Sequence, residues 1–501
     1  MQNVLARWAV IFAIIAICPV CRAAEAAKER PAGVAGMFYP ADAGELTRAV
    51  DGALSRAEVS KATGSLVAIV APHAGYEYSG AVAAHSYALL KGRKFKRVVI
   101  IGPSHFEWIG YSSVYDGDAY TTPLGKVAVD REFARKLAGS APSIRLSASG
   151  HELRQQPEHS VEVQLPFLQR VLGDFQVVPV VMGADSYLAG RELGLALAKL
   201  LQGSNDTLLV ASSDLSHYHP YDEAVRLDRS LLNAIEQGDF LTVSHNTETR
   251  VWEACGAAPI VAVMIAAERL GAPAPRLLKY ANSGDVTSDK SRVVGYAALA
   301  FFRTTGASAE RKFSVAAAER AELLRIARQS VETAVRERKA YQPPAPSSAN
   351  LAQARGVFVT LTKNGELRGC IGYTSPRFPL YLAVRDVAAY AALEDPRFAP
   401  VRPDELSKLQ YEISVLSPFR HVLKTETVRV GEHGLLIKQG DREGVLLPQV
   451  PVELRWDRRT FLEEVSRKAG LPHDAWQSPA TDLFTFTALV FSDHGAGAKA
   501  E

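Results

Sequence analysis

Apolar residues in the first three fifths of the chain come in short continuous runs, and a polar cluster closes each run. A strand buried on both faces is apolar at nearly every position, so these runs predict strands of a largely parallel sheet. The segments between the runs predict helices. Alternating strands and helices indicate an α/β domain over residues 31–303. The predicted strands are residues 65–71, 97–102, 176–182, 207–211 and 293–301, and the predicted helices include residues 79–90, 161–172 and 188–201.

The pattern changes after this domain. Residues 304–312 are small and polar, which is typical of a linker. A charged helix is expected over residues 315–341, and a proline-rich stretch follows it. Two alternating segments then predict half-buried strands, and an apolar segment predicts a helix, which indicates an α+β domain over residues 313–491. These three segments are residues 356–361, 411–416 and 380–393.

The first two dozen residues differ from both domains. Arg7 precedes an almost wholly apolar stretch, and small residues follow it up to Ala24. This is the pattern of a secretory signal peptide, so we expect residues 1–23 to be removed and the protein to be periplasmic or secreted. An uncleaved membrane anchor is the alternative, but the apolar stretch is short for a spanning helix. No later segment is apolar for long enough to cross a membrane.

Charge and cysteine content narrow the possible partners. The net charge of +3 over 501 residues gives no electrostatic reason to expect nucleic acid as a partner. After loss of the signal peptide the chain keeps two cysteines, Cys255 and Cys370. A disulfide between them is one interpretation of an exported protein. Separate roles are preferred, because each cysteine lies in a motif of its own.

Three of the predicted strands are followed closely by a histidine. His73, His105 and His217 each come within a few residues of a strand end. Ligands of open α/β sheets bind at the carboxyl edge of the strands, and three imidazoles at that edge indicate a metal site. Asp214 precedes His217 and is a candidate metal ligand or a partner that orients a ligating histidine.

Cys255 is the fourth candidate ligand. It comes just before a helix that is expected to begin near Pro259. The N-terminus of a helix lowers the pKa of a thiol and favours the thiolate form, which binds metals. Two or three histidines with one thiolate suit iron, copper or zinc. We expect one metal ion, with iron or copper favoured over zinc.

Glu158 and His159 are expected at the start of a further helix. Glu158 is a candidate to orient a metal ligand or to act as a base, and His159 lies one helical turn from Glu162 on the same face. Helix capping and solvation of the helix surface explain these residues almost as well.

The motifs around these residues resemble, in the same order, those of the Memo-like proteins, which are also called AmmeMemoRadiSam system protein B. The resemblance implies a fold similar to the LigB-type, class III extradiol dioxygenases, which are non-haem iron enzymes. It implies that His73, His105 and Cys255 are the metal ligands, and that His217 and Asp214 line the same pocket. Cys255 stands where such a dioxygenase offers a carboxylate, which argues against ring cleavage. The matching segments are residues 71–76, 102–105, 158–160, 212–217 and 255–256.

The second half carries the hexapeptide Leu-Arg-Gly-Cys-Ile-Gly at residues 367–372. With its flanking segments it resembles the AMMECR-type domain, also called AmmeMemoRadiSam system protein A. Arg368 is a candidate anion-binding residue and Cys370 a candidate nucleophile, with His433 as a possible activating base. A structural cysteine packed between glycines is the alternative. The fusion of the two proteins implies a radical SAM protein as a partner.

Three functions fit these features. The first is a metal-dependent oxidoreductase that acts on a small molecule or a protein side chain. The second is a metal-containing binding or scaffold protein without turnover. The third is a metal-assisted hydrolase with Asp214 or Glu158 as its base. The candidate catalytic residues are Asp214, His217, Glu158 and His159.

Overall fold

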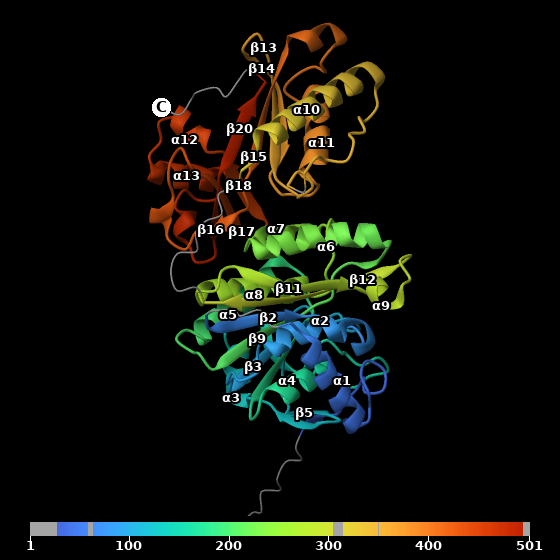
Figure 1. The fold of residues 1–501 in the computed structure, drawn as a ribbon. Helices are drawn as coiled ribbons and strands as arrows, with labels where there is room; N and C mark the ends of the chain where they lie inside the picture. Colours follow the sequence, from blue (N-terminus) through green and yellow to red (C-terminus); the bar gives the residue numbers. More distant parts are fainter. Residues whose placement is uncertain (1–27, 59–63, 304–313, 349, 494–501) are drawn as a thin grey trace, which may run out of the picture.

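The computed structural model describes residues 28–58, 64–303, 314–348 and 350–493. The predicted signal peptide and the predicted linker lie outside the described residues. The chain forms two folded parts, one above the other in Figure 1, with residues 28–303 below, coloured from blue to yellow-green, and residues 314–493 above, coloured from golden yellow to red. Within these described ranges, no helix is both long and apolar enough to cross a membrane.

A nine-stranded mixed sheet forms the centre of the first part. Its four middle strands are parallel, as the apolar runs predict, and their bounds differ from the predicted ones by at most one residue. In spatial order these strands are β2 (Leu66–Ala71), β9 (Thr207–Ser212), β3 (Arg97–Pro103) and β8 (Gln176–Met182).

The last apolar run differs from this prediction. It forms β12 (Val293–Phe302), which pairs with β2 in the antiparallel direction. The reason is its connection: β11 (Pro275–Asn282) precedes it and turns back through the short helix α9 (Ser283–Thr287), so that β11 and β12 pair antiparallel as well. An apolar run predicts that a strand is buried on both faces but carries no information about its direction.

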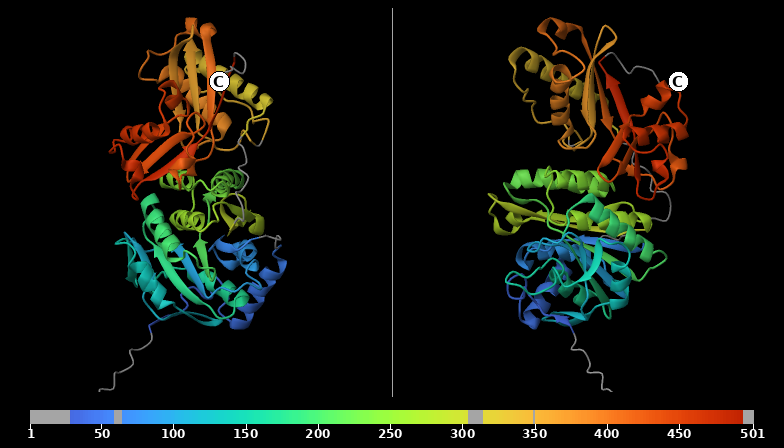
Figure 2. Two further views of the ribbon diagram at one scale, coloured as in Figure 1. Left: turned by 90° about the vertical axis from the view of Figure 1, so that its left-hand side faces the viewer. Right: turned by 180° about the vertical axis from the view of Figure 1, so that it is seen from behind.

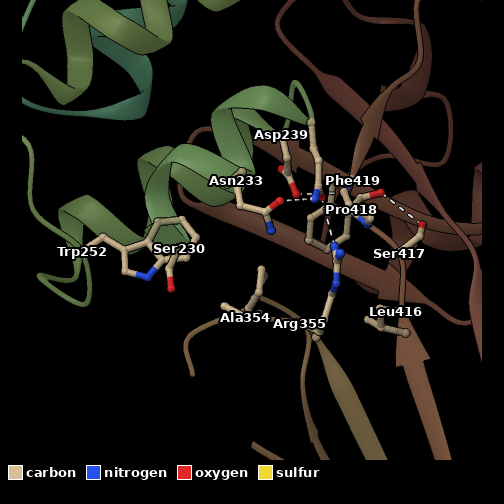
Figure 3. Close-up of a pocket in the computed structure, with 14 residues that line it drawn as sticks. Ser230, Asn233, Asp239, Trp252, Ala354, Arg355, Leu416, Ser417, Pro418 and Phe419 are labelled. Atoms are coloured by element: carbon tan, nitrogen blue, oxygen red, sulfur yellow. Dashed lines mark hydrogen bonds between the residues drawn. The ribbon is translucent and has the colours of Figure 1, made fainter. Parts of the chain in front are cut away.

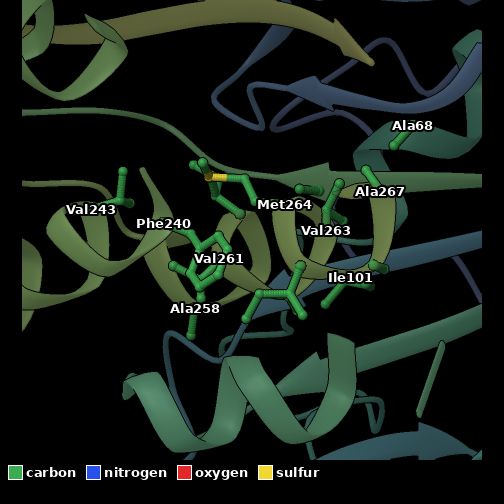
Figure 4. Close-up of a cluster of buried hydrophobic side chains, with 14 of the residues drawn as sticks. Ala68, Ile101, Phe240, Val243, Ala258, Val261, Val263, Met264 and Ala267 are labelled. Carbon is green, nitrogen blue, oxygen red and sulfur yellow. The ribbon is translucent and has the colours of Figure 1, made fainter. Parts of the chain in front are cut away.

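Helices cover both faces of this sheet, as the α/β pattern predicts. Neighbouring residues of one strand point to opposite faces, so Val98 and Ile100 of β3 join one apolar cluster while Val99 and Ile101 join the other. Figure 4 shows part of the second cluster, where Val261, Val263 and Met264 pack together with other apolar side chains. The first face carries α1 (Ala43–Arg56), α2 (Tyr76–Ala88) and α4 (Leu165–Val171), and the second carries α5 (Tyr187–Leu200), α7 (Phe240–Glu248) and α8 (Ala257–Arg269).

The second part contains two four-stranded antiparallel sheets. The first has the order β14 (Glu366–Tyr373), β13 (Val357–Lys363), β15 (Leu409–Leu416) and β20 (Ala488–Ser492). Apolar side chains of this sheet pack against α10 (Ala317–Glu337) and α11 (Leu380–Leu393), which confirms the predicted α+β pattern. The second has the order β16 (Arg420–His421), β19 (Asp482–Phe486), β17 (Gly434–Gln439) and β18 (Arg442–Leu446), with α13 (Arg458–Lys468) beside it.

The two parts share one apolar cluster, in which Phe240 of α7 contacts the aromatic rings of His421 and Phe484. Both views of Figure 2 show the helices at the top of the first part facing the lower edge of the second part. Next to this cluster the two parts enclose a space of about 20 Å³, room for about one water molecule. Figure 3 shows residues of both parts lining this space, and the amide N–H of Phe419 donates to Asp239 there at 3.0 Å.

A polar network closes the same interface. The carboxylate of Asp482 accepts hydrogen bonds from the Tyr187 hydroxyl at 2.7 Å and from Arg191 Nε at 2.5 Å. His421 lies between two acids, with Nδ1 at 2.9 Å from Glu268 and Nε2 at 3.6 Å from Asp482. Burial by itself would lower the pKa of His421, but the two carboxylates raise it above its ordinary value. Since Glu268 lies near the end of α8, this helix joins the interface to the sheet of the first part.

Candidate metal centre

Three histidines gather beside the carboxyl ends of the central strands. His73 lies two residues after β2, His105 two residues after β3, and His159 in the loop before the 3₁₀ turn Glu162–Gln164 (η1). One ring nitrogen from each lies within 4.8 Å of the others, and the ring centroids are 4.7 to 5.4 Å apart. This spacing suits three imidazoles around one cation.

Ser212 determines which nitrogen of His73 carries the proton. The Ser212 hydroxyl donates its single hydrogen to the carbonyl of Ser160 at 2.6 Å and accepts from the side-chain amide of Gln164 at 2.7 Å. His73 Nδ1, at 2.9 Å from the same oxygen, must therefore donate. His73 Nε2 then carries a lone pair. Burial, helped by the neighbouring His105 and His159, holds the pKa of His73 well below its ordinary value, so the ring is neutral near pH 7.

Glu158 determines in the same way which nitrogen of His105 carries the proton. Its carboxylate accepts from His105 Nδ1 at 3.0 Å and from the backbone N–H groups of His105, His159 and Ser160 at 2.6 to 2.9 Å. Burial opposes the charge on this carboxylate, but the hydrogen bonds from His105 hold the pKa of Glu158 well below its ordinary range. An ionised Glu158 keeps the proton of His105 on Nδ1 and leaves Nε2 free to bind a metal.

His159 is buried and lies over Phe38, at 4.3 Å between ring centroids. Its Nδ1 has no hydrogen-bond partner among the described residues. Burial is the main reason that the pKa of His159 falls to about 4. A buried, neutral nitrogen without a partner costs free energy unless a water or a cation satisfies it, so this ring fits a metal site.

The structure corrects two expectations for this segment. Glu158 and His159 precede the helical turn instead of beginning it, because η1 starts at Glu162. The side chains of Glu158, His159 and Glu162 are all buried, so surface solvation does not explain them. The sequence suggested His159 as a catalytic residue, and the structure places it in the group with His73 and His105. Its position beside a glutamate in a polar segment did not mark it as a metal ligand in the sequence.

Cys255 contacts one of these three histidines, His73, and lies outside the group of three imidazoles itself. Its Sγ lies 3.1 Å from His73 Nε2 and 3.3 Å from the backbone nitrogen of Asp214, which donates to it. The expected lowering of the thiol pKa is wrong. Burial and the neighbouring Asp214 raise the pKa of Cys255 well above its ordinary value, and these effects outweigh a helix that begins two residues later at Ala257. A bound cation favours the thiolate and would act against this shift.

Asp214 supports the loop of His73. Its Oδ1 accepts from the backbone nitrogens of His73 at 2.8 Å and Ala74 at 3.3 Å. Burial is the main cause that raises the pKa of Asp214 to about 7, against these two hydrogen bonds. His217 lies in β10 (His217–His219), with its backbone nitrogen donating to Glu253 at 3.1 Å. His217 is not in the group of three imidazoles. Burial is the main cause that lowers its own pKa.

The candidate residues of the second part have other partners. Arg368 forms two hydrogen bonds with Glu405, at 3.2 and 3.1 Å, so this carboxylate already occupies the place of the expected anion. Cys370 Sγ accepts from the Thr360 hydroxyl at 3.3 Å. His433 lies before β17, in the other sheet. Both described cysteines are free, which excludes the disulfide between Cys255 and Cys370.

Comparisons with known proteins agree with this division of the chain. The Memo-like protein family model matches residues 30–300, and the AMMECR1 family model matches residues 324–491. A MEMO1 family protein of Methanopyrus kandleri is 39% identical over 285 residues, which cover 55% of this chain and 99% of that protein. Another, of Aeropyrum pernix, is 40% identical and covers 53% of this chain and 96% of its own length.

A solved structure of an uncharacterized protein from Pyrococcus horikoshii is 40% identical, with a TM-score of 0.32, and the match covers 34% of this chain and 89% of that chain. The family match of the first part spans more than half of the chain and includes all three histidines and Cys255. The chain therefore belongs to the Memo-like protein family, with an AMMECR1 domain following its Memo-like domain.

Proposed function

We propose that the Memo-like domain binds one redox-active metal ion, iron or copper, and that the chain is a metal-dependent oxidoreductase. His73, His105 and His159 would hold the ion, with Cys255 as a further ligand. When bound, such an ion supplies electron transfer to or from a substrate.

The observation that carries this proposal is the fixed proton position on two histidines. Ser212 accepts a hydrogen bond from Nδ1 of His73, and Glu158 accepts one from Nδ1 of His105. The Nε2 atoms of both histidines are therefore available as ligands without rearrangement. The unpartnered Nδ1 of His159 and the Cys255 thiol, 3.1 Å from His73 Nε2, add a third imidazole and a soft donor. A mixed set of imidazole and sulfur donors favours iron or copper over magnesium or calcium.

Asp214 and Glu158 are the two candidates to transfer protons to or from a substrate. Asp214 keeps the loop of His73 in place through Oδ1, and its backbone nitrogen donates to Cys255 Sγ. Burial raises the pKa of its carboxyl group to about 7, so this group would gain and lose a proton near neutral pH. Glu158 is less suited to move a proton, because four hydrogen bonds already surround its carboxylate. If the protein is instead a metal-assisted hydrolase, Asp214 is therefore the better candidate base.

The wider setting is part of the same proposal. We propose that the N-terminal residues are a signal peptide, that the protein works in the periplasm or outside the cell, and that its Memo-like domain has the fold of LigB-type dioxygenases. A radical SAM protein of the AmmeMemoRadiSam type is the proposed partner.

Metal analysis tests the function first. The protein is purified without air, its iron and copper are counted, and oxygen consumption with ascorbate is measured for wild type and for His105→Ala. The proposal expects about one ion per chain and loss of both ion and turnover in the variant. A wild type without a stoichiometric metal would contradict the proposal. A bound metal without oxygen consumption would favour the scaffold or the hydrolase.

A further inference from the structure

A buried ion pair contacts the segment that carries Glu158 and His159. Arg30 of β1 (Glu29–Arg30) and Glu162 of η1 are 132 positions apart in the chain, and their side chains are 3% and 0% exposed. One nitrogen of the Arg30 guanidinium donates to Glu162 Oε2. Two buried charges of this kind lose much hydration, and their attraction repays that loss only with good geometry and further hydrogen bonds.

Glu162 has such further hydrogen bonds. Its carboxylate accepts from the backbone nitrogens of Gly33 and Val34 at 2.9 to 3.0 Å and from the Tyr39 hydroxyl at 2.6 Å. Glu162 therefore ties the segment from Arg30 to Tyr39 to the turn that follows His159.

Two further nitrogens of Arg30 donate to backbone carbonyls in the segment that precedes His159. Arg30 Nε donates to the carbonyl of His151 at 2.7 Å, and Arg30 Nη2 donates to the carbonyl of Glu158 at 2.6 Å. Glu158 is the residue whose carboxylate fixes the proton of His105, and His159 is the next residue in the chain. A single guanidinium thus contacts the segment between β7 (Ile144–Ser147) and η1 at two points, and the second, Glu158, directly precedes His159.

We infer that Arg30, with Glu162 as its counter-charge, is a positioning residue for the metal centre. Its three-way contact holds the Glu158 backbone, so that the Glu158 carboxylate meets His105 and the His159 ring meets His73. This inference rests on the proposed metal-binding function. A pair that served stability alone could be replaced by apolar residues at little cost, whereas the planar fork of arginine is needed to contact a carboxylate and two carbonyls together.

Binding of Co²⁺ to the purified full chain tests the inference. The ligand-field bands of Co²⁺ report the number and geometry of its ligands, and its affinity is obtained by titration. Arg30→Lys keeps the charge opposite Glu162 but loses the planar fork. Tyr39→Phe removes one hydrogen bond to Glu162 and keeps the ring. The matched control is Arg97→Lys: Arg97 pairs with Asp130 at 2.6 Å at the start of β3, the end opposite to His105.

We expect Arg30→Lys to weaken Co²⁺ binding by about tenfold or more, as loss of a group that supports a metal ligand does, and to shift the ligand-field bands. Tyr39→Phe should also weaken Co²⁺ binding, by a smaller factor. If Arg30→Lys does not fold, the affinity and spectrum of Tyr39→Phe test the inference. Arg97→Lys should change neither affinity nor spectrum. Wild-type affinity and spectrum in both Arg30→Lys and Tyr39→Phe would overturn the inference while leaving the metal site intact. No Co²⁺ binding by wild type would remove the proposed function and this inference with it.

Discussion

His73 Nε2 and Cys255 Sγ lie 3.1 Å apart, although 182 positions separate the two residues in the chain. A thiol at this distance from a ring nitrogen with a free lone pair either donates its S–H to that nitrogen or shares a cation with it. The two states differ in the charge on sulfur, so substitution of the cysteine separates them.

Cys255→Ser should weaken iron or copper binding by about tenfold or more, because it removes the soft ligand. The Cys370→Ser variant is the matched control, since Cys370 accepts a hydrogen bond from Thr360 in the other domain. Metal counts and Co²⁺ titrations of the two variants measure the difference. If both variants retained the wild-type affinity, Cys255 would be a hydrogen-bond donor to His73 and not a ligand.

Ser212→Ala should lower metal affinity although it replaces none of the proposed ligands. The change removes the acceptor that keeps the proton of His73 on Nδ1, and we expect a loss of about tenfold in affinity. It also leaves the Ser160 carbonyl and the Gln164 amide short of a partner, at a cost of about 1–3 kcal/mol of unfolding free energy.

The control for stability is Ser86→Ala. Ser86 is also fully buried, and its hydroxyl donates to the carbonyl of Val70 at 2.7 Å. Urea unfolding should detect a loss of stability in both serine variants, whereas Co²⁺ affinity should fall only for Ser212→Ala. Equal affinity in the two variants would show that the proton position of His73 has no effect on binding.

The contact between the two domains should weaken as pH rises. The carboxylates of Asp482 and Glu268 raise the pKa of His421 above its unfolded value of about 6.5. The contribution of His421 to the free energy of unfolding is fully present below about pH 6.5, its unfolded pKa, and is lost as pH rises through the raised folded pKa. Burial by itself would raise the pKa of Asp482, but hydrogen bonds from His421 and Arg191 lower it to about 2. The contribution of Asp482 to the free energy of unfolding is therefore lost only in strong acid.

Thermal unfolding of the full chain between pH 5 and pH 9 measures this effect. We expect the midpoint to fall by roughly 2–4 °C for each kcal/mol lost as His421 gives up its proton. His421→Gln should lower the midpoint at pH 5 and flatten its pH dependence. An unchanged slope in this variant would assign the pH dependence to another group.

Gly369→Ala should destabilise the AMMECR1 domain by about 1–3 kcal/mol, because an added methyl group has no space. A Cβ at this position would lie 2.0 Å from the carbonyl oxygen of Ala391 in α11, so strand β14 and this helix would have to separate. Gly173→Ala is the control, since nothing lies within 4 Å of a Cβ there. Chemical unfolding of both variants gives the comparison, and a neutral Gly369→Ala would exclude close packing as the reason for this glycine.

Several features of this protein were determined by the sequence alone. The four central strands were predicted within one residue, because a strand buried on both faces must be apolar along its whole length. The same argument placed His73 and His105 at one edge of the sheet, since parallel strands bring their carboxyl ends together. The direction of β12 was not predictable, because the short turn through α9 sets it and not the apolar run itself.

Only the tertiary structure decided the chemistry of the site. It brought His159 to His73 and His105, buried the Cys255 thiol so that its pKa rose, and paired Arg368 with Glu405. Each of these depends on contacts between residues far apart in the chain. Periodicity reports which side of one element faces the interior, whereas pKa values, proton positions and ligand groups depend on neighbours that other elements supply.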